Sequence, residues 1–310
     1  MAASDMKKEC KVACVVPTRN GGNDLRALFS SLKNQKQYFD LYVVDSESTD
    51  DSFEQAYSAG ADVTKIPAEE FDHGGTRQLM INKLVGYDVC VFLTQDAELA
   101  TPYSLAKLVE PFQDQNVGAT YGRQLPKENA TPFAAFLRHF NYPGHSVRQS
   151  LASIPFLGMK TVFLSNSFAA YRRRALQEVG GFPEKVILGE DVYAAACLVS
   201  AGWEVAYIAD AECFHSHNYS IFQEWRRYFD IGVFHSDESW ILERFGSVGG
   251  EGRRFVIEEL RYLSSEHKNL LIASLIRNAG KFLSYQLGKR ERFLPCWVKR
   301  RLAMHSKYWN

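Results

Sequence analysis

Short apolar runs alternate with amphipathic stretches through the first third of the chain. Mostly apolar runs occupy residues 12–16, 41–44, 63–66 and 89–93, and Pro17 is expected to stop the first. Such runs are typical of strands covered on both faces of a parallel sheet. The stretches between them predict helices at 25–32, 50–59 (capped by Ser48 or Thr49) and 76–84. This alternation predicts an α/β fold with a mostly parallel, doubly wound sheet flanked by helices.

Weaker patterns continue beyond that point. We expect a helix from Pro102, a strand at 117–121, a helix at 133–140, a strand at 168–171, a helix at 172–179, a helix at 190–201, strands at 204–208 and 212–217, and a long helical region at 221–245. A glycine-rich break at 246–252 predicts a domain boundary. The predicted organisation is a domain over 1–245, with halves at about 11–121 and 122–245, and a basic helical region over 246–310.

Polar residues follow several of the predicted strands directly. They are Pro17, Thr18, Arg19 and Asn20 after the first strand, Asp45 and Ser46 after the second, and Gln95 and Asp96 after the fourth. Ligands of open α/β sheets bind at the carboxyl ends of strands, so we expect these groups to converge. Asp45 is either a turn residue or an acceptor for a base N–H or a ribose hydroxyl. No Gly-x-Gly-x-x-Gly motif follows the first strand, which argues against the commonest dinucleotide site.

Composition narrows the class of protein. The 36 basic residues equal the 36 acidic ones, which argues against a nucleic-acid-coating protein. The six cysteines form no Cys-x-x-Cys pair, a pattern typical of a reducing compartment. The N-terminus, residues 1–9, is polar and has no apolar signal core, and no stretch is long and apolar enough to span a bilayer. We therefore expect a cytoplasmic protein.

Asp96, His215 and His217 are candidate metal ligands. Residues two apart on a strand project to the same face, so His215 and His217, at the end of the strand expected at 212–217, could share a ligand. A mixed carboxylate and imidazole set suits Mn²⁺ at least as well as Mg²⁺. The alternatives are a loop aspartate and two structural histidines.

Glu190 and Asp191 open a helix with almost no polar face. Ala194, Ala195 and Ala196 follow, so the helix is expected to be buried with its acidic end at a pocket. A carboxylate held against apolar surface can act as a general base near neutral pH. The alternative is that both acids merely complement the helix dipole.

A glycine-containing loop leads into the helix expected at 76–84. His73, Gly74 and Arg77 could form an anion site with the first N–H groups of that helix. The alternative is an ordinary capped helix start, with Asp72 or Thr76 as the cap.

The C-terminal stretch is strongly basic. Nine basic residues stand against one acid, Glu291: Arg277, Lys281, Lys289, Arg290, Arg292, Lys299, Arg300, Arg301 and Lys307. Leu, Phe and Trp residues lie between them, a pattern typical of interfacial membrane segments. One alternative is a helical appendage with its lysines in solvent. The other is RNA binding, although the sequence has no recognisable RNA-binding module.

The motifs resemble those of family 2 glycosyltransferases in order and spacing. The similarity lies in Val15–Asn20, Val43–Asp50, Phe92–Ala97 and Gly189–Asp191 and covers about residues 11–245. Phe71–Arg77, Asn166–Arg172, Gly180–Pro183 and His215–Ser220 further resemble bacterial rhamnosyltransferases of cell-surface polysaccharide synthesis. Thr94 stands where the family has the first acid of its Asp-x-Asp motif, Glu47 replaces a usual Gly, and Gln78 replaces a frequent Asn.

The resemblance implies a GT-A fold and an inverting glycosyl transfer. It implies that Pro17, Thr18 and Asp45 surround the nucleoside and that Asp191 is the base that deprotonates the acceptor, with Glu190 and Asn166 beside it. Asp96 with His215 or His217 would hold a divalent cation, Mg²⁺ or Mn²⁺, on the donor diphosphate.

The implied donor is dTDP-L-rhamnose, and the implied acceptor is a lipid-linked or oligosaccharide glycan at the inner face of the plasma membrane, in O-antigen or capsule synthesis. Three other interpretations stay open: a UDP-sugar donor on the same fold, a non-catalytic scaffold in a polysaccharide assembly complex, and a nucleotidyltransferase.

Overall fold

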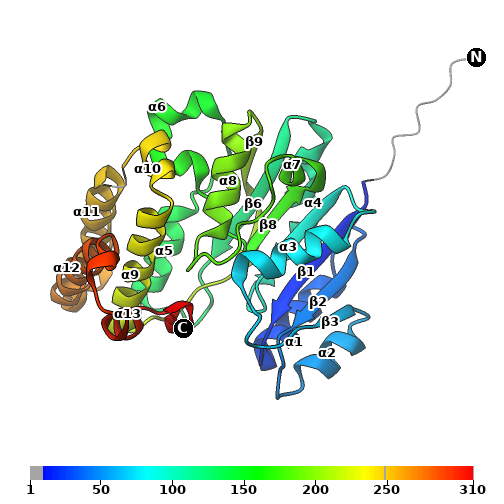
Figure 1. Ribbon diagram of the computed structural model, residues 1–310, viewed down its shortest axis with the longest axis horizontal. Helices are drawn as coiled ribbons and strands as arrows, with labels where there is room; N and C mark the ends of the chain where they lie inside the picture. Colours follow the sequence, from blue (N-terminus) through cyan, green and yellow to red (C-terminus); the bar gives the residue numbers. More distant parts are fainter. Residues whose placement is uncertain (1–9, 248, 310) are drawn as a thin grey trace, which may run out of the picture.

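A mixed sheet runs through the middle of the molecule (Figure 1). The computed structural model describes residues 10–247 and 249–309, so the polar N-terminus discussed above lies outside the described residues. Within them the strand order is β3-β2-β1-β4-β8-β6-β9-β5, and β7 also pairs with β9. The strands are β1 (Val12–Thr18), β2 (Asp40–Asp45), β3 (Asp62–Lys65), β4 (Val89–Leu93), β5 (Glu98–Leu99), β6 (Val117–Leu125), β7 (Val147–Gln149), β8 (Phe168–Arg172) and β9 (Glu204–Phe214).

Six of these strands run in the same direction. β1 is parallel to β2 and β4, and β2 is parallel to β3. β8 is antiparallel to both β4 and β6, so β6 and its parallel partner β9 follow the direction of β4. The sheet is therefore mostly parallel, as the sequence predicted. The short strands β5 and β7, which had no clear sequence pattern, are antiparallel additions to β9.

Helices cover both faces of the sheet. They are α1 (Gly22–Lys33), α2 (Ser52–Ser58), α3 (His73–Lys83), α4 (Ser104–Val109), α5 (Pro132–Asn141), α6 (Ile154–Leu157), α7 (Arg173–Glu178), α8 (Glu190–Ser200), α9 (Ile221–Asp237), α10 (Ser239–Phe245), α11 (Gly249–Glu266), α12 (Leu271–Gly288) and α13 (Cys296–Leu302). Ala13 and Val15 of β1 join the core under α3, α7 and α8, whereas Cys14 and Val16 join the core under α1, α2 and α4. Both faces of the strand are buried, which explains its unbroken apolar run.

Several predicted boundaries were wrong. β1 continues through Pro17, which pairs in register with Val44 of β2. The pairing with β4 ends at Val15, so Pro17 sits where β1 has a single neighbour and a missing N–H is tolerated. Helix α2 is preceded by Asp51 and has no side-chain cap, contrary to the expected Ser48 or Thr49. Helix α4 begins at Ser104 and not at Pro102.

The last core strand differs most from expectation. A single strand, β9, replaces the two predicted strands, with a register shift opposite Gly122 and Arg123 of β6. β9 ends at Phe214, so His215 and His217 lie past it and not on it. The His215 N–H still donates to the Leu125 carbonyl at 2.9 Å, which continues the pairing by one residue.

The C-terminal helices pack beside the sheet domain. The helical region predicted over 221–245 is broken at Glu238, between α9 and α10. The glycine-rich stretch is mostly helical, since α11 begins at Gly249. α12 lies against α9 at close range: a Cβ on Gly280 would approach Trp225 to 2.0 Å. Among the described helices, none is both long and apolar enough to cross a membrane.

Candidate active site

The loops after β1, β2 and β4 are tied together by side chains. Gln95 Oε1 accepts hydrogen bonds from Thr18 Oγ1 at 2.8 Å and from the Arg19 N–H at 3.0 Å. Asn20 Oδ1 accepts from the Thr49 N–H at 2.8 Å. The polar residues at these strand ends therefore converge, as the parallel topology led us to expect.

Asp45, the last residue of β2, and Ser46 belong to the same group of strand-end residues. Both are buried, and the Ser48 N–H donates to Asp45 Oδ2 at 3.2 Å. Asp45 Oδ1 and Ser46 Oγ have no hydrogen-bond partner within the described part of the chain. An unpaired buried polar oxygen costs free energy, so these two atoms suit a ligand that brings hydrogen-bond donors.

Asp96, His215 and His217 lie within reach of one another. His215 Nε2 is 3.4 Å from Asp96 Oδ2, and His217 Nε2 is 3.7 Å from the same oxygen. The three potential ligand atoms lie within 4.8 Å of one another. Burial alone would raise the pKa of Asp96, but the hydrogen bond and charge of His215, with the charge of His217, hold that pKa below its usual range.

Gln124 fixes the orientation of His215. Gln124 Nε2 donates to Ser165 Oγ at 3.0 Å, and its Oε1 faces both Arg138 and His215 Nδ1, the latter at 2.9 Å. In this assignment Oε1 is the acceptor, so His215 Nδ1 carries a proton; Nε2 donates to Asp96 when the imidazole is protonated and presents a lone pair to Asp96 when it is neutral. A lone pair and a carboxylate at this distance suit a cation between them. The donor set therefore fits a divalent metal ion.

Asp191 stands at the start of α8. It is half-buried, and its carboxylate accepts the Asn166 N–H at 3.2 Å and its neighbour Val192's N–H at 2.9 Å. Burial, together with the negative charge of Glu190, raises the pKa of Asp191 to about 7. A carboxylate with this pKa can take up a proton near neutral pH.

Gly189 makes the turn that places Asp191. Its φ of 84° lies in the left-handed region, and a Cβ there would approach Phe234 to 3.0 Å. Glycine adopts this conformation without the steric cost that other residues meet. The tight turn sets α8 in the core beneath it, as its apolar sequence predicted.

Glu190 has a different environment from Asp191. It pairs with Arg77 at 3.1 Å and accepts from Asn166 Nδ2 at 3.0 Å, while Tyr171 donates to Asn166 Oδ1 at 2.8 Å. Burial opposes its ionisation, but the charges of Arg77 and His73 hold the pKa of Glu190 below its usual value. Asn166 thus holds both acids in place.

The expected anion site at the start of α3 does not agree with this geometry. Arg77 is buried, and it donates to the His73 carbonyl at 2.8 Å in addition to its pair with Glu190. Gly74 packs closely on the Pro183 carbonyl, and the Gly75 N–H is bound by the cap Asp72 at 2.6 Å. These groups stabilise the loop around Glu190, and Asp72 proves to be the cap.

His73 likewise faces protein. Its ring packs edge-on against Phe71, with centroids 5.0 Å apart, and against His305, at 5.4 Å. Burial lowers the pKa of His73 to about 4.

One segment joins the two clusters. The Thr94 N–H, near Asp96, approaches the Ser167 carbonyl at 3.4 Å, and Ser165 Oγ accepts from Gln124. The intervening Asn166 holds Asp191 through its backbone. Residues 165–167 therefore contact both Asp191 and the segments that carry the Asp96–His215–His217 cluster.

Some residues of the site were not anticipated. Gln124 is the last residue but one of β6, and the strand predicted from the sequence ended at residue 121, so the rule that singled out Asp45 and Asp96 at strand ends did not reach it. Asp230 and His305 bond each other at 2.9 Å and contact the site through the His73 ring. Their separation of 75 residues gave no local signal.

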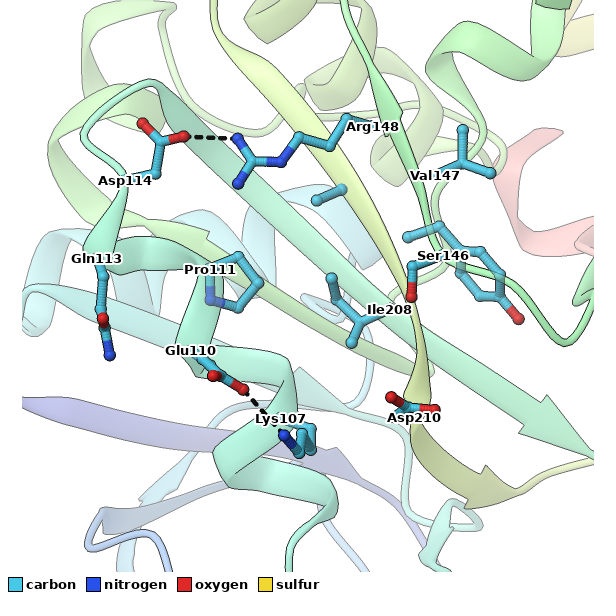
Figure 2. A pocket seen from close by; sticks show the side chains of 12 residues that line it. Lys107, Glu110, Pro111, Gln113, Asp114, Ser146, Val147, Arg148, Ile208 and Asp210 are labelled. Carbon is cyan, nitrogen blue, oxygen red and sulfur yellow. Dashed lines mark hydrogen bonds and ion pairs between the residues drawn. The ribbon is translucent and has the colours of Figure 1, made fainter.

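One pocket of the described residues lies away from this site. It measures about 430 Å³ and shares no residue with the candidate site. Figure 2 shows its polar rim, with Arg148 bonded to Asp114 and Lys107 bonded to Glu110. These charges are already paired, so we assign it no role in the chemistry.

Comparison with known proteins defines the class. Residues 13–180 match the family described as Glycosyl transferase family 2. The chain belongs to this family.

Two curated relatives match nearly the whole chain. The O-antigen chain rhamnosyltransferase RfbN of Salmonella typhimurium (strain LT2) is 43% identical over 302 residues, which cover 97% of this chain and 96% of the relative. The O-antigen chain rhamnosyltransferase WbaN of Salmonella anatum is 43% identical over 300 residues, covering 96% of this chain and 95% of the relative.

Solved structures confirm the GT-A fold. The mannosyltransferase PcManGT from Pyrobaculum calidifontis, in complex with GDP-Man and Mn²⁺, superimposes with a TM-score of 0.60 at 16% identity, covering 96% of this chain and 84% of that one. S. aureus TarS 1–349, in complex with UDP-GlcNAc, gives a TM-score of 0.54 at 13% identity, covering 91% of each chain.

Proposed function

We propose that the protein transfers L-rhamnose from dTDP-L-rhamnose to a lipid-linked or oligosaccharide acceptor in O-antigen synthesis, with inversion at the anomeric carbon. The names of the two full-length relatives support the sugar and the glycan. The main structural support is that residues 165–167 contact both Asp191 and the segments that carry the Asp96 cluster.

The chemistry follows from these two groups. A carboxylate oxygen of Asp191 takes the proton of the acceptor hydroxyl while the oxygen of that hydroxyl forms a bond to the anomeric carbon. The bond from this carbon to the diphosphate oxygen breaks on the opposite face, and the electron pair leaves with the nucleoside diphosphate. Glu190, kept ionised by Arg77, stays in its own ion pair and maintains the raised pKa of Asp191.

A divalent cation, Mg²⁺ or Mn²⁺, would be held by Asp96 with His215 or His217. When bound, it would supply Lewis-acid stabilisation of the charge on the departing diphosphate. The Mn²⁺ in the PcManGT complex supports a cation of this kind. Asp45 Oδ1 would accept a hydrogen bond from the nucleoside, and Ser46 Oγ would accept or donate one.

The test of the base is Asp191→Asn, assayed for transfer with dTDP-L-rhamnose and an O-antigen acceptor. Loss of a general base lowers a rate by roughly 10²–10⁴-fold, and we expect kcat to fall by that much. Asp210→Asn, the same change at an exposed aspartate, is the matched control. Transfer by Asp191→Asn at the rate of the control would remove Asp191 from this role.

The test of the cation site is Asp96→Ala in thermal unfolding with nucleoside diphosphates. We expect dTDP with Mn²⁺ to raise the unfolding temperature of the unchanged protein and to have little effect on the variant, because ligands stabilise the state that binds them. Equal stabilisation of both proteins would place the cation elsewhere. Both pyrimidines offer the N–H that Asp45 could accept, so this contact does not distinguish dTDP-L-rhamnose from a UDP-sugar. A panel of dTDP- and UDP-sugars in the same assay separates these two candidate donor classes.

We also propose that the protein works at the inner, cytoplasmic face of the plasma membrane, where a lipid-linked acceptor would be presented.

A further inference from the structure

Helix α12 has its polar side turned inward. Ser274 and Lys281 are buried, the first donating to Glu259 Oε1 at 2.5 Å and the second 3.7 Å from Glu224 Oε1. Gly280 and Gly288 on the same side allow close contact with α9. Polar contacts and close approach at two glycines therefore help to hold α12 to the rest of the protein.

The opposite side of α12 is apolar and exposed. Its large side chains are between 44% and 73% exposed: Ile272, Leu275, Ile276, Phe282, Leu283 and Leu287. Their spacing of three and four places them along one stripe of the helix, which we call the outer face. α12 stands at the left margin of the molecule in Figure 1, away from the sheet. Contiguous exposed apolar surface of this kind marks an interaction site.

Charge indicates what this face contacts. The outer face has no acidic residue, and the exposed cations Lys289, Arg290 and Arg292 follow directly after it. Phe293 and Trp297, 73% and 69% exposed, come next in the chain. Apolar side chains beside cations match the acyl boundary and the anionic headgroups of a bilayer. A second copy that packed through the same helix would bring the same cations and no acid from that helix.

We propose that α12 is a membrane-docking element that lies flat in the interface of an anionic bilayer, with its outer face among the acyl chains. Its length and composition do not suit a crossing of the membrane, whereas an interfacial helix needs only one apolar side.

The docking helix is linked closely to the candidate site. Arg277 of α12 pairs with Glu224 at 2.8 Å and donates to the Tyr219 carbonyl at 3.3 Å. The Tyr219 ring stacks on His217, with centroids 5.1 Å apart. Docking through α12 would hold the Asp96 cluster at a fixed position relative to the bilayer. This consequence for a lipid-linked acceptor rests on the proposed function, whereas the membrane binding itself does not.

The test is flotation of the full chain with vesicles of phosphatidylglycerol and phosphatidylcholine, without donor or acceptor. We expect binding to these vesicles and weak binding to phosphatidylcholine alone. The double variant Ile276→Glu/Leu283→Glu should lose at least tenfold in binding, because it places two charges in the apolar stripe. Both positions are exposed, so folding should not suffer. The matched control is Tyr57→Glu/Val85→Glu, at exposed apolar residues outside the C-terminal region.

The cations are tested separately. Lys289→Ala/Arg290→Ala should weaken binding to anionic vesicles by roughly fivefold for each residue at low salt. Lys33→Ala/Lys36→Ala, at exposed lysines of the sheet domain, should leave it unchanged.

Unchanged vesicle binding by Ile276→Glu/Leu283→Glu would overturn the proposal. The proposal would also be overturned if the unchanged chain did not bind vesicles and Ile276→Glu/Leu283→Glu converted a dimer into a monomer. The outer face would then join two copies of the chain. Vesicle binding by a chain that transfers no sugar would count against the proposed function and leave α12 as a docking element.

Discussion

Two aspartates of the site receive opposite electrostatic environments. Asp191 lies beside Glu190 in a desolvated position, which raises its pKa to about 7. Asp96 is also partly buried, but His215 and His217 hold its pKa below the usual range. A carboxylate that takes up a proton and one that stays ionised to bind a cation need such a difference. The proposed roles therefore follow from neighbouring side chains and not from residue type.

The raised pKa of Asp191 predicts a pH dependence. A base must be ionised, so kcat/KM for transfer should rise with pH and level off above about 7. Glu190→Gln removes the neighbouring negative charge and keeps a side-chain oxygen for Asn166. This change should lower the pKa of Asp191 and move the rising limb to lower pH. The measurement is a pH profile of kcat/KM for both proteins.

The pH profile of kcat/KM can contradict the assignment of Asp191 as the base. A limb that stays in place in Glu190→Gln would mean that another group titrates. Because the variant leaves Arg77 buried without its ion pair, it should be assayed well below its unfolding temperature.

At the scale of elements, the sheet was predictable and the ends of its strands were less so. Strands buried on both faces need unbroken apolar runs, which made β1, β2 and β4 visible in the sequence. The limits of β9 were not predictable, because its register shift depends on β6. The same holds for α12: its amphipathic pattern was visible, but which side faces the protein depends on contacts with α9 and α11.

At the scale of the whole molecule, the C-terminal segment folds back to α9 and the site. Asp230 is fully buried in α9, and it accepts the N–H groups of Met304 and His305 at 3.1 and 2.9 Å. His305 in turn contacts the His73 ring. The domain boundary predicted near residue 246 remains a prediction.

Asp230→Asn tests this anchor. We expect a loss of about 1.5–3 kcal/mol in the free energy of unfolding, the usual contribution of hydrogen bonds to a charged group. Chemical denaturation measures it. Asp237→Asn on the same helix is the control, because among the described residues this exposed carboxylate bonds only to the Tyr308 hydroxyl, at 3.4 Å. A loss no larger than that of the control would show that the segment is held by other contacts.

The sequence by itself determined the fold class, the strand ends that carry polar residues and the family. Apolar periodicity and motif order are local properties, so they can be read without coordinates. The tertiary structure decided which of these residues meet. It paired Arg77 with Glu190, placed Gln124 behind His215 and turned the apolar side of α12 outward. Such pairings depend on contacts between segments far apart in the chain, and no local pattern encodes them.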